Sequence, residues 1–192
     1  MNYRFMQKTK SKPLRTRLPS EIFMKRSILP FGNESVRLRL IEKIDLKTTL
    51  SWRNQDEARI WFKTAKIITL QQHKEWFNQY QYKDDDFLFV IESRGDLVGQ
   101  ASVYDIQWEN GVAEIGRFLA APQYVGKGLI SQACTLLLEN CKHVLDLNYV
   151  FLEVIENNHH AKKLYQRHGF TEESRYNGLI RMGRKLQQNT SC

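Results

Sequence analysis

A run of six residues, Gln123-Tyr124-Val125-Gly126-Lys127-Gly128, has the composition of a phosphate-binding turn. It follows a predicted strand over 112–119 and precedes a predicted helix. The apolar residues of that helix recur at the helical spacing of three and four, namely Ile130, Ala133, Cys134, Leu137, Cys141 and Val144. Glycines let several backbone N–H groups converge on one point, and the helix start adds about half a positive charge there. The run therefore predicts a pyrophosphate site, although many glycine turns only connect elements.

Glu153 and Tyr165 are two further residues whose types and positions permit chemistry. Glu153 interrupts the apolar run 150–155, where an unpaired buried carboxylate would be too costly, so it must face a cleft, a partner or water. Partial burial makes a carboxylate a stronger base. Tyr165 ends the pattern Asn158-x-x-Ala161-x-x-Leu164-Tyr165, which is followed by Gly169-Phe170.

Together, the Gln-x-x-Gly-x-Gly turn, Leu152-Glu153-Val154, the Asn158 to Tyr165 pattern and Gly169-Phe170 resemble the GNAT superfamily of N-acetyltransferases. The resemblance covers residues 87–186 and extends more loosely back to Arg37. It implies a mixed α/β fold, with a central, mostly antiparallel sheet flanked by helices. It also implies an acetyl-CoA-dependent N-acetyltransferase of the branch that includes ribosomal-protein and amino-sugar enzymes.

Acetyl transfer to an amine requires removal of a proton from the amine, a donor for the oxyanion, and a proton for the departing thiolate. By the resemblance, Tyr165 is the catalytic acid, and Glu153, twelve residues earlier, is the base or acts through water. The alternatives are a core tyrosine with its hydroxyl at the surface and a structural strand glutamate.

The resemblance also implies a cofactor site made of a strand end, the glycine turn and the following helices. Its residues are Phe118, Leu119, Ala120, Gln123, Val125, Gly126, Lys127, Gly128, Leu129, Ile130, Asn158 and Tyr165. The backbone of 118–120 would pair with the pantetheine arm like an added strand, and one N–H would serve the oxyanion. Lys162 and Lys163 are further candidate phosphate contacts, unless they are ordinary surface lysines.

The acceptor site is expected among aromatic, basic and polar residues of the first helices and the central strands. The candidates are Trp52, Arg53, Asn54, Trp61, His73, Glu114 and Arg117. Aromatic and cationic side chains suit an anionic acceptor, which favours a nucleotide-linked amino sugar. A protein N-terminus, as on a ribosomal protein, is the alternative. A polyamine is disfavoured because no acidic cluster is visible, and plain helix packing would explain the aromatic residues equally well.

A non-catalytic module that binds acyl-CoA or RNA is the alternative of another class, and the presence of both Glu153 and Tyr165 argues against it. Positive charge is concentrated at the start of the chain. Residues 1–30 contain eight Lys and Arg and one acidic residue, so they supply +7 of the net charge of +8. The remainder is therefore a poor candidate for nucleic-acid binding.

We expect a basic N-terminal extension over 1–34 and a single acetyltransferase domain over 35–192. The extension is interpreted as solvated; ribosome or RNA contact through 1–30, or an organellar transit peptide, are the alternatives. Met24 is an alternative start.

His159, His160 and His168 lack ligands at compatible spacing, so no metal is expected. No run of eighteen apolar residues is present, so no membrane span is expected. Three cysteines without a secretory signal indicate a reducing, cytoplasmic location. A monomer or homodimer is expected, with a small-molecule amine as acceptor.

Periodicity and turn residues predict the remaining elements. Thr69 and Gln72 form a capping-box pattern, Asn110-Gly111 indicates a hairpin, and Asn158 is expected to cap a helix that Gly169 ends. The predicted strands are 36–40, 87–92, 97–106, 112–119, 149–155 and 179–186, and the further helices are one or two within 45–62 and one from Thr69 to about Tyr80. This order of elements is a mixed α/β layout.

Overall fold

The computed structural model describes residues 25–62 and 64–186. The strands are β1 (Phe31–Gly32), β2 (Arg37–Leu40), β3 (Asp86–Ser93), β4 (Asp96–Gln107), β5 (Val112–Ala120), β6 (Tyr149–Ile155), β7 (Thr171–Tyr176) and β8 (Leu179–Lys185). The α-helices are α1 (Leu46–Arg53), α2 (Asp56–Arg59), α3 (Leu70–Tyr80), α4 (Leu129–His143) and α5 (His159–Arg167), and the short 3-10 helices are η1 (Lys43–Asp45) and η2 (Pro122–Tyr124).

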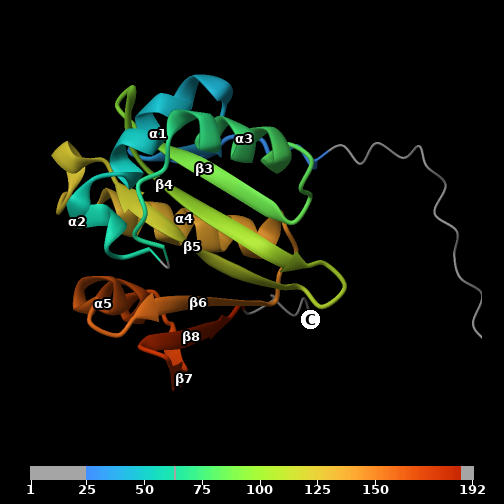
Figure 1. The fold of residues 1–192 in the computed structure, drawn as a ribbon. Helices are drawn as coiled ribbons and strands as arrows, with labels where there is room; N and C mark the ends of the chain where they lie inside the picture. Colours follow the sequence, from blue (N-terminus) through green and yellow to red (C-terminus); the bar gives the residue numbers. More distant parts are fainter. Residues whose placement is uncertain (1–24, 63, 187–192) are drawn as a thin grey trace, which may run out of the picture.

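The strands form one sheet in the order β1-β2-β3-β4-β5-β6-β8-β7. Figure 1 shows β3, β4 and β5 in one part of this sheet and β6, β8 and β7 in the other. All neighbouring strands are antiparallel except β5 and β6, which are parallel because α4 connects them. The predicted mixed, mostly antiparallel sheet flanked by helices is therefore confirmed.

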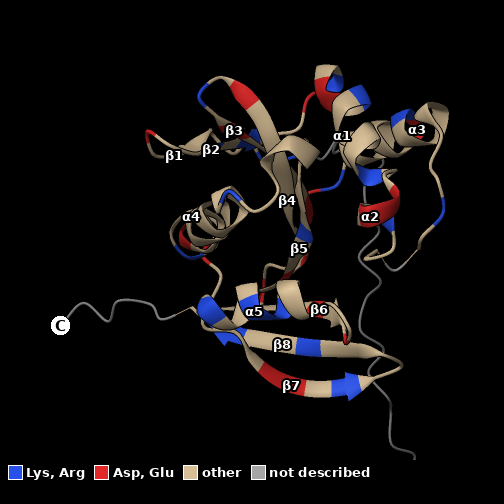
Figure 2. Cartoon of the chain, turned by 90° about the vertical axis from the view of Figure 1, so that its left-hand side faces the viewer, with Lys and Arg blue, Asp and Glu red and all other residues tan. Residues whose placement is uncertain are grey.

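The two faces of the sheet are covered by different helices (Figure 2). Phe87, Phe89 and Ile91 of β3 belong to the core cluster that contains the buried face of α4. The intervening Leu88 and Val90 belong to a second cluster with α1 and α3 residues such as Leu46 and Phe77. Alternation of side chains along a strand thus separates an α4 face from an α1/α3 face.

Both predicted helix caps are present. The Thr69 hydroxyl accepts from the Gln72 N–H at 3.2 Å, and the Gln72 side chain accepts from the Thr69 N–H at 2.9 Å. Asn158 Oδ1 accepts from the Ala161 N–H at 3.1 Å at the start of α5. These local signals act within one helical turn, which explains why sequence alone located them.

Some sequence expectations differ from the structure. Val144 was expected on the apolar side of α4, but it is 61% exposed because the helix ends at His143. The strands β1 and β7 were not anticipated. All six residues of β7 are exposed and polar or aromatic, so this edge strand lacks the apolar alternation that reveals a strand.

Residues 25–34, which belong to the predicted extension, contact the domain. Ile28 is buried, and β1 pairs with β2. Residues 1–24 lie outside the described part of the chain. No helix within the described ranges combines the length and apolar character that a membrane crossing requires.

Candidate active site

The strands β5 and β6 pair at one end and then separate. Their register joins Val112 to Tyr149, Ala113 to Val150 and Glu114 to Phe151. Beyond this point β5 continues beside β4 as far as Ala120, whereas β6 continues beside β8 as far as Ile155. The separation leaves a wedge whose two strand edges have backbone groups available to an extended ligand.

A bulge in β5 lies where the wedge opens. Between the pairs Gly116–Ser102 and Leu119–Gln100, two residues of β5 stand opposite one of β4, and the first of them, Arg117, has a φ of 53°. The Ala121 N–H donates to Val98 O at 2.8 Å. Because backbone groups alternate along a strand, the N–H and C=O of Ala120 point away from β4, toward the wedge.

The side chain of Arg117 fixes the bulge on the α1/α3 face. Its guanidinium forms an ion pair with Asp86 at 2.7 Å and lies 4.1 Å from the centroid of the Tyr104 ring. Asp86 is only 4% exposed, so the ion pair is formed largely out of water. The expected acceptor residue Arg117 therefore has two partners at the mouth of the wedge.

The glycine turn follows β5 directly. Gly126 and Gly128 have φ values of 78° and 76°, a conformation that side-chain-bearing residues rarely adopt, and a Cβ at either position would meet no atom within 4 Å. Gly128 precedes α4 and supplies no side-chain cap to it. The first N–H groups of α4 thus lie behind an open, glycine-lined turn, which suits a phosphate group.

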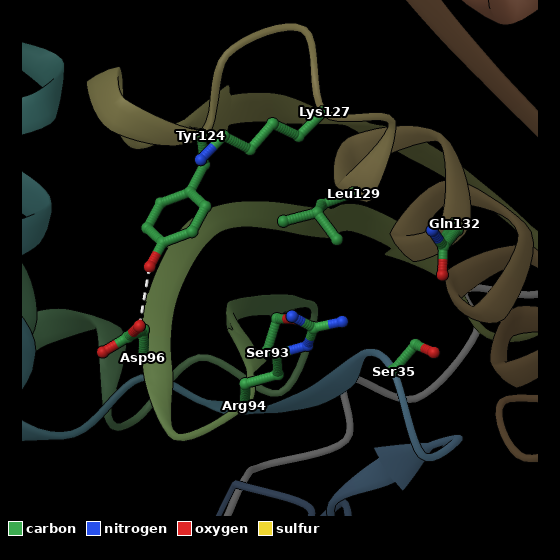
Figure 3. Close-up of a pocket in the computed structure, with 8 residues that line it drawn as sticks. All are labelled: Ser35, Ser93, Arg94, Asp96, Tyr124, Lys127, Leu129 and Gln132. Carbon is green, nitrogen blue, oxygen red and sulfur yellow. Dashed lines mark hydrogen bonds between the residues drawn. The ribbon is translucent and has the colours of Figure 1, made fainter.

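A pocket of about 440 Å³ lies beside this turn, between α4 and the β3–β4 connection (Figure 3). The Tyr124 hydroxyl donates to Asp96 at 2.7 Å, and the Lys127 ammonium lies 4.8 Å from the centroid of the Tyr124 ring. Arg94 supplies a second cation. The expected phosphate contact Lys127 is therefore on the rim of a pocket that offers positive charge.

Tyr165 lies on the other side of the wedge, on α5. Its side chain is 8% exposed, and its ring centroid is 5.9 Å from that of Phe118 and 6.1 Å from that of Phe170. Burial raises the pKa of Tyr165 well above its ordinary value, so the phenol keeps its proton at neutral pH. Since a proton donor must be protonated, this environment is compatible with an acid role.

Glu153 points to the opposite face. Val150, Leu152 and Val154 of β6 are buried with α4, whereas the alternate residues are half-buried, and Glu153 is among them. Its carboxylate accepts a hydrogen bond from the Tyr176 hydroxyl of β7. The predicted acid and base therefore lie on opposite faces of the sheet, on either side of the wedge.

Glu114 is an acidic residue of β5 on the same face as Glu153. It is 7% exposed and accepts a hydrogen bond from the Tyr104 hydroxyl at 2.6 Å. Because Glu114 and Phe151 form the last register pair before the strands separate, Glu153 lies two residues further along β6, on the same face as Glu114. Two carboxylates thus flank the mouth of the wedge.

The expected acceptor residues of α1 have structural partners. Trp52 is 5% exposed. The Arg53 guanidinium donates to the carbonyls of Thr64 and Lys66, and the Asn54 amide both donates to and accepts from the Ile68 backbone. Arg53 and Asn54 therefore brace the connection from α2 to α3, and their contact with an acceptor stays a prediction.

The other two expected acceptor residues of the first helices, Trp61 and His73, differ in exposure and in their contacts. Trp61 is 43% exposed. The His73 ring stacks on Trp76 at 5.1 Å, its Nε2 lies 3.3 Å from the Thr49 hydroxyl, and burial lowers its pKa. Neutral His73 is thus held by α1 and α3 on the same face as Glu114, and its acceptor role also stays a prediction.

Sequence reasoning missed Asp86, Tyr104 and Tyr176. Asp86 ends the acidic run 84–86, which was interpreted only as a polar break, and Tyr104 fits the alternation of an ordinary strand. Tyr176 reaches Glu153 across β8, so nothing in its local sequence signals the contact. In the described ranges, no group of three or more His, Cys, Asp or Glu side chains is arranged to hold a metal ion.

Comparison with known proteins agrees with this geometry. Residues 35–171 match the family model described as an acetyltransferase (GNAT) domain, so the chain belongs to the GNAT acetyltransferase family. It is an N-acetyltransferase with acetyl-CoA as the acetyl donor. The sequence-based predictions of family, enzyme class and cofactor are confirmed.

Individual relatives differ in what they acetylate. A spermidine N(1)-acetyltransferase of Escherichia coli K12 is 27% identical over 140 residues, covering 72% of this chain and 74% of that protein. A putative ribosomal N-acetyltransferase, YdaF, of Bacillus subtilis is 28% identical over 151 residues, covering 74% and 81%. The solved spermidine N-acetyltransferase of Vibrio cholerae, in complex with CoA and spermine, shares the fold with a TM-score of 0.74 at 24% identity, covering 80% and 97%.

Proposed function

We propose that the acceptor is a primary amine of a polyamine such as spermidine. The observation that carries this proposal is the placement of two carboxylates, Glu114 and Glu153, on one face of β5 and β6 at the mouth of the wedge. Carboxylates attract ammonium groups, and the sequence had disfavoured a polyamine only because no acidic cluster was visible. Two spermidine or spermine acetyltransferases among the relatives support the same acceptor class.

The nucleotide-linked amino sugar favoured by sequence has less support. An anionic acceptor needs cations that are available to it, but Arg53 is engaged with two backbone carbonyls and Arg117 with Asp86. A protein N-terminus carries only one ammonium group, which makes less use of two neighbouring carboxylates. The amino sugar and the protein N-terminus are therefore compared with polyamines in the assay of CoA release.

In the proposed site, two elements bind different parts of the cofactor. The backbone edge at 118–120 would take the pantetheine arm, and the glycine turn with the first turn of α4 would take the pyrophosphate. Acetyl-CoA supplies the acetyl group as a thioester. Asn158 Oδ1 caps α5, and the expected contact of Asn158 with the cofactor stays a prediction.

We assign the catalytic roles according to the face of the sheet on which each side chain lies. Glu153 takes a proton from the ammonium group, which frees the lone pair that attacks the thioester carbonyl. A wedge-facing N–H of β5 stabilises the oxyanion that forms. When the carbon–sulfur bond breaks, Tyr165 gives its proton to the departing sulfur, and the proton that the attacking nitrogen loses on forming the amide restores the phenol. This arrangement has the amine arriving from the α1/α3 face and the thioester from the α4 face.

Release of CoA, measured against spermidine, spermine, a nucleotide-linked amino sugar and a peptide with a free N-terminus, tests the acceptor. We expect the highest kcat/KM with the polyamines. Glu114→Gln should raise the KM for spermidine about tenfold or more, because a charged hydrogen bond is lost, and should leave the KM for acetyl-CoA unchanged. Glu109→Gln, which removes an exposed glutamate of the β4–β5 hairpin, is the matched control. A higher kcat/KM with the sugar or the peptide would refute the polyamine.

We also propose that residues 1–24 are an accessory extension. Deleting residues 1–23 should leave CoA binding intact while removing most of the basic charge. Loss of folding on deletion would contradict this, and loss of binding to RNA with retained acetyl transfer would assign the extension to nucleic acid. The expected monomer or homodimer is tested by light scattering on the full chain.

A further inference from the structure

Tyr176 is the last residue of β7, and its hydroxyl donates a hydrogen bond to Glu153 Oε1 on β6. The strand β8 lies between them, so the phenol ring reaches over one strand to make this contact. The turn Asn177-Gly178 follows directly, with φ values of 49° and 75°, and leads into β8. The contact therefore joins the outer hairpin of the sheet to the carboxylate at the mouth of the wedge.

The charged and titratable groups around Glu153 come from three neighbouring strands. On β8, Arg181 is its register partner, and that guanidinium lies 3.6 Å from the centroid of the Phe151 ring and 3.3 Å from Glu173 of β7. On β5, Glu114 and Arg117 stand at the mouth of the wedge. Tyr176 adds a neutral donor to this set.

We propose that Tyr176 is a positioning residue for Glu153. A phenol that donates to one carboxylate oxygen restricts the rotation of the glutamate side chain and so fixes the carboxylate relative to the incoming ammonium group. Tyr176 keeps its own proton throughout and forms no bond to either substrate. This inference rests on the proposed base role of Glu153.

The variant Tyr176→Phe tests the inference because it removes the donor and keeps the ring. Tyr176 is 41% exposed, so the loss should not unfold the domain. With spermidine as acceptor we expect kcat to fall about tenfold, since a hydrogen bond to a charged group is lost. The KM for acetyl-CoA should stay unchanged.

Tyr149→Phe is the matched control. The Tyr149 hydroxyl also donates to a carboxylate on the same face of the same strands, but that carboxylate is Glu173. This variant should retain the kcat with spermidine and the position of the acidic limb of the kcat/KM–pH profile. Equal losses in both variants would show a general effect on the outer hairpin and would overturn the positioning role.

A double variant separates positioning from independent contributions. In a Glu153→Gln background, Tyr176→Phe should cause no further loss, because the carboxylate that it positions is absent. Multiplicative losses would overturn the inference. If wild-type protein fails to acetylate spermidine, the proposed acceptor is wrong. If Glu153→Gln leaves the acidic limb of the kcat/KM–pH profile unaltered, the assignment of Glu153 as the base is wrong. An active wild type, an impaired Glu153→Gln and a silent Tyr176→Phe would refute the inference alone.

Discussion

The ring of Tyr165 on α5 lies 5.9 Å from the ring of Phe118 on β5, and this contact joins the two sides of the wedge on the α4 face. The strand that carries Phe118 and the helix that carries Tyr165 are separated in the chain by α4 and β6. The contact places a buried phenol beside the strand edge that is expected to take the cofactor arm. It also leaves the opposite face of the wedge to Glu114 and Glu153.

Replacing Tyr165 with Phe should reduce turnover by about 100- to 10,000-fold, the usual contribution of general acid catalysis. The ring contacts with Phe118 and Phe170 are retained, so the affinity for CoA, measured by calorimetry, should change little. Tyr80→Phe is the control. The Tyr80 hydroxyl accepts a hydrogen bond from the Leu88 N–H at 2.9 Å, and this contact lies outside the wedge. Loss of the hydroxyl should therefore lower stability and leave kcat unchanged. Unchanged turnover in Tyr165→Phe, with chemistry limiting the rate, would remove the acid role.

Replacing Glu153 with Gln should lower activity most at neutral pH, because the amine then has no base. Activity should partly return at high pH, where the free amine loses its proton in solution. A pH–rate profile with spermidine measures both effects. A variant whose acidic limb coincides with that of the wild type would leave Glu153 a structural residue of β6.

Gly126→Glu should abolish stabilisation of the fold by CoA. A ligand at 100 times its dissociation constant adds roughly 2.7 kcal/mol to the free energy of unfolding, which thermal unfolding detects. A glutamate in the turn opposes the φ of 78° and repels phosphate. Gly178→Glu is a matched control, because Gly178 has a φ of 75° and equally open surroundings in the β7–β8 turn. A folded Gly126→Glu protein that CoA still stabilises would contradict the pyrophosphate site.

The buried Arg39–Asp45 ion pair should contribute strongly to stability. The Arg39 guanidinium binds Asp45 at 2.7 and 3.0 Å and also contacts Glu92 at 2.7 Å, and the Asp45 side chain is only 2% exposed. Asp45→Ala leaves a partly buried cation without its main partner and should cost about 3–5 kcal/mol in urea unfolding. Asp56 forms an ion pair with Arg59, but the Asp56 side chain is 79% exposed. Asp56→Ala should therefore lower the free energy of unfolding by less than about 1 kcal/mol. Equal costs would contradict this assignment.

Lys25 should make stability depend on pH above neutrality. Its ammonium lies 3.1 Å from the centroid of the Tyr80 ring, and burial lowers the pKa of Lys25 to about 7, with Asp86 opposing the shift. Between this pKa and the ordinary value of 10.5, the unfolded chain binds a proton that the folded chain lacks, so the free energy of unfolding rises with pH in that window.

A Lys25→Met variant lacks this titration. The free energy of unfolding of the wild type minus that of the variant should therefore increase from about pH 7 to about pH 10. Lys47→Met, which removes an exposed lysine from α1, controls for the loss of one charge. A difference that stays constant over this range would place the Lys25 amine in water.

Short-range patterns allowed much of this protein to be predicted from sequence. The glycine turn, the capping box at Thr69 and the Asn158 cap each depend on residues within one turn of one another, so their physical chemistry is complete in the local sequence. Together with strand periodicity they predicted the mixed sheet and the positions of most elements, and the resemblance to the GNAT superfamily predicted the acetyl-CoA enzyme. The exposed edge strand β7 escaped because no buried face imposes a pattern on it.

The tertiary structure decided how the acceptor face is built. Glu114 and Glu153 become neighbours only through the parallel register of β5 and β6, and Arg117 meets Asp86 only through the order of β3, β4 and β5. Tyr176 meets Glu153 because β8 turns back between β6 and β7. Strand register is a property of long-range pairing and core packing, and local sequence does not encode which side chains it brings together. The sequence by itself therefore determined the family, the cofactor and the local turns, whereas pairing of distant strands determined which charges surround the wedge.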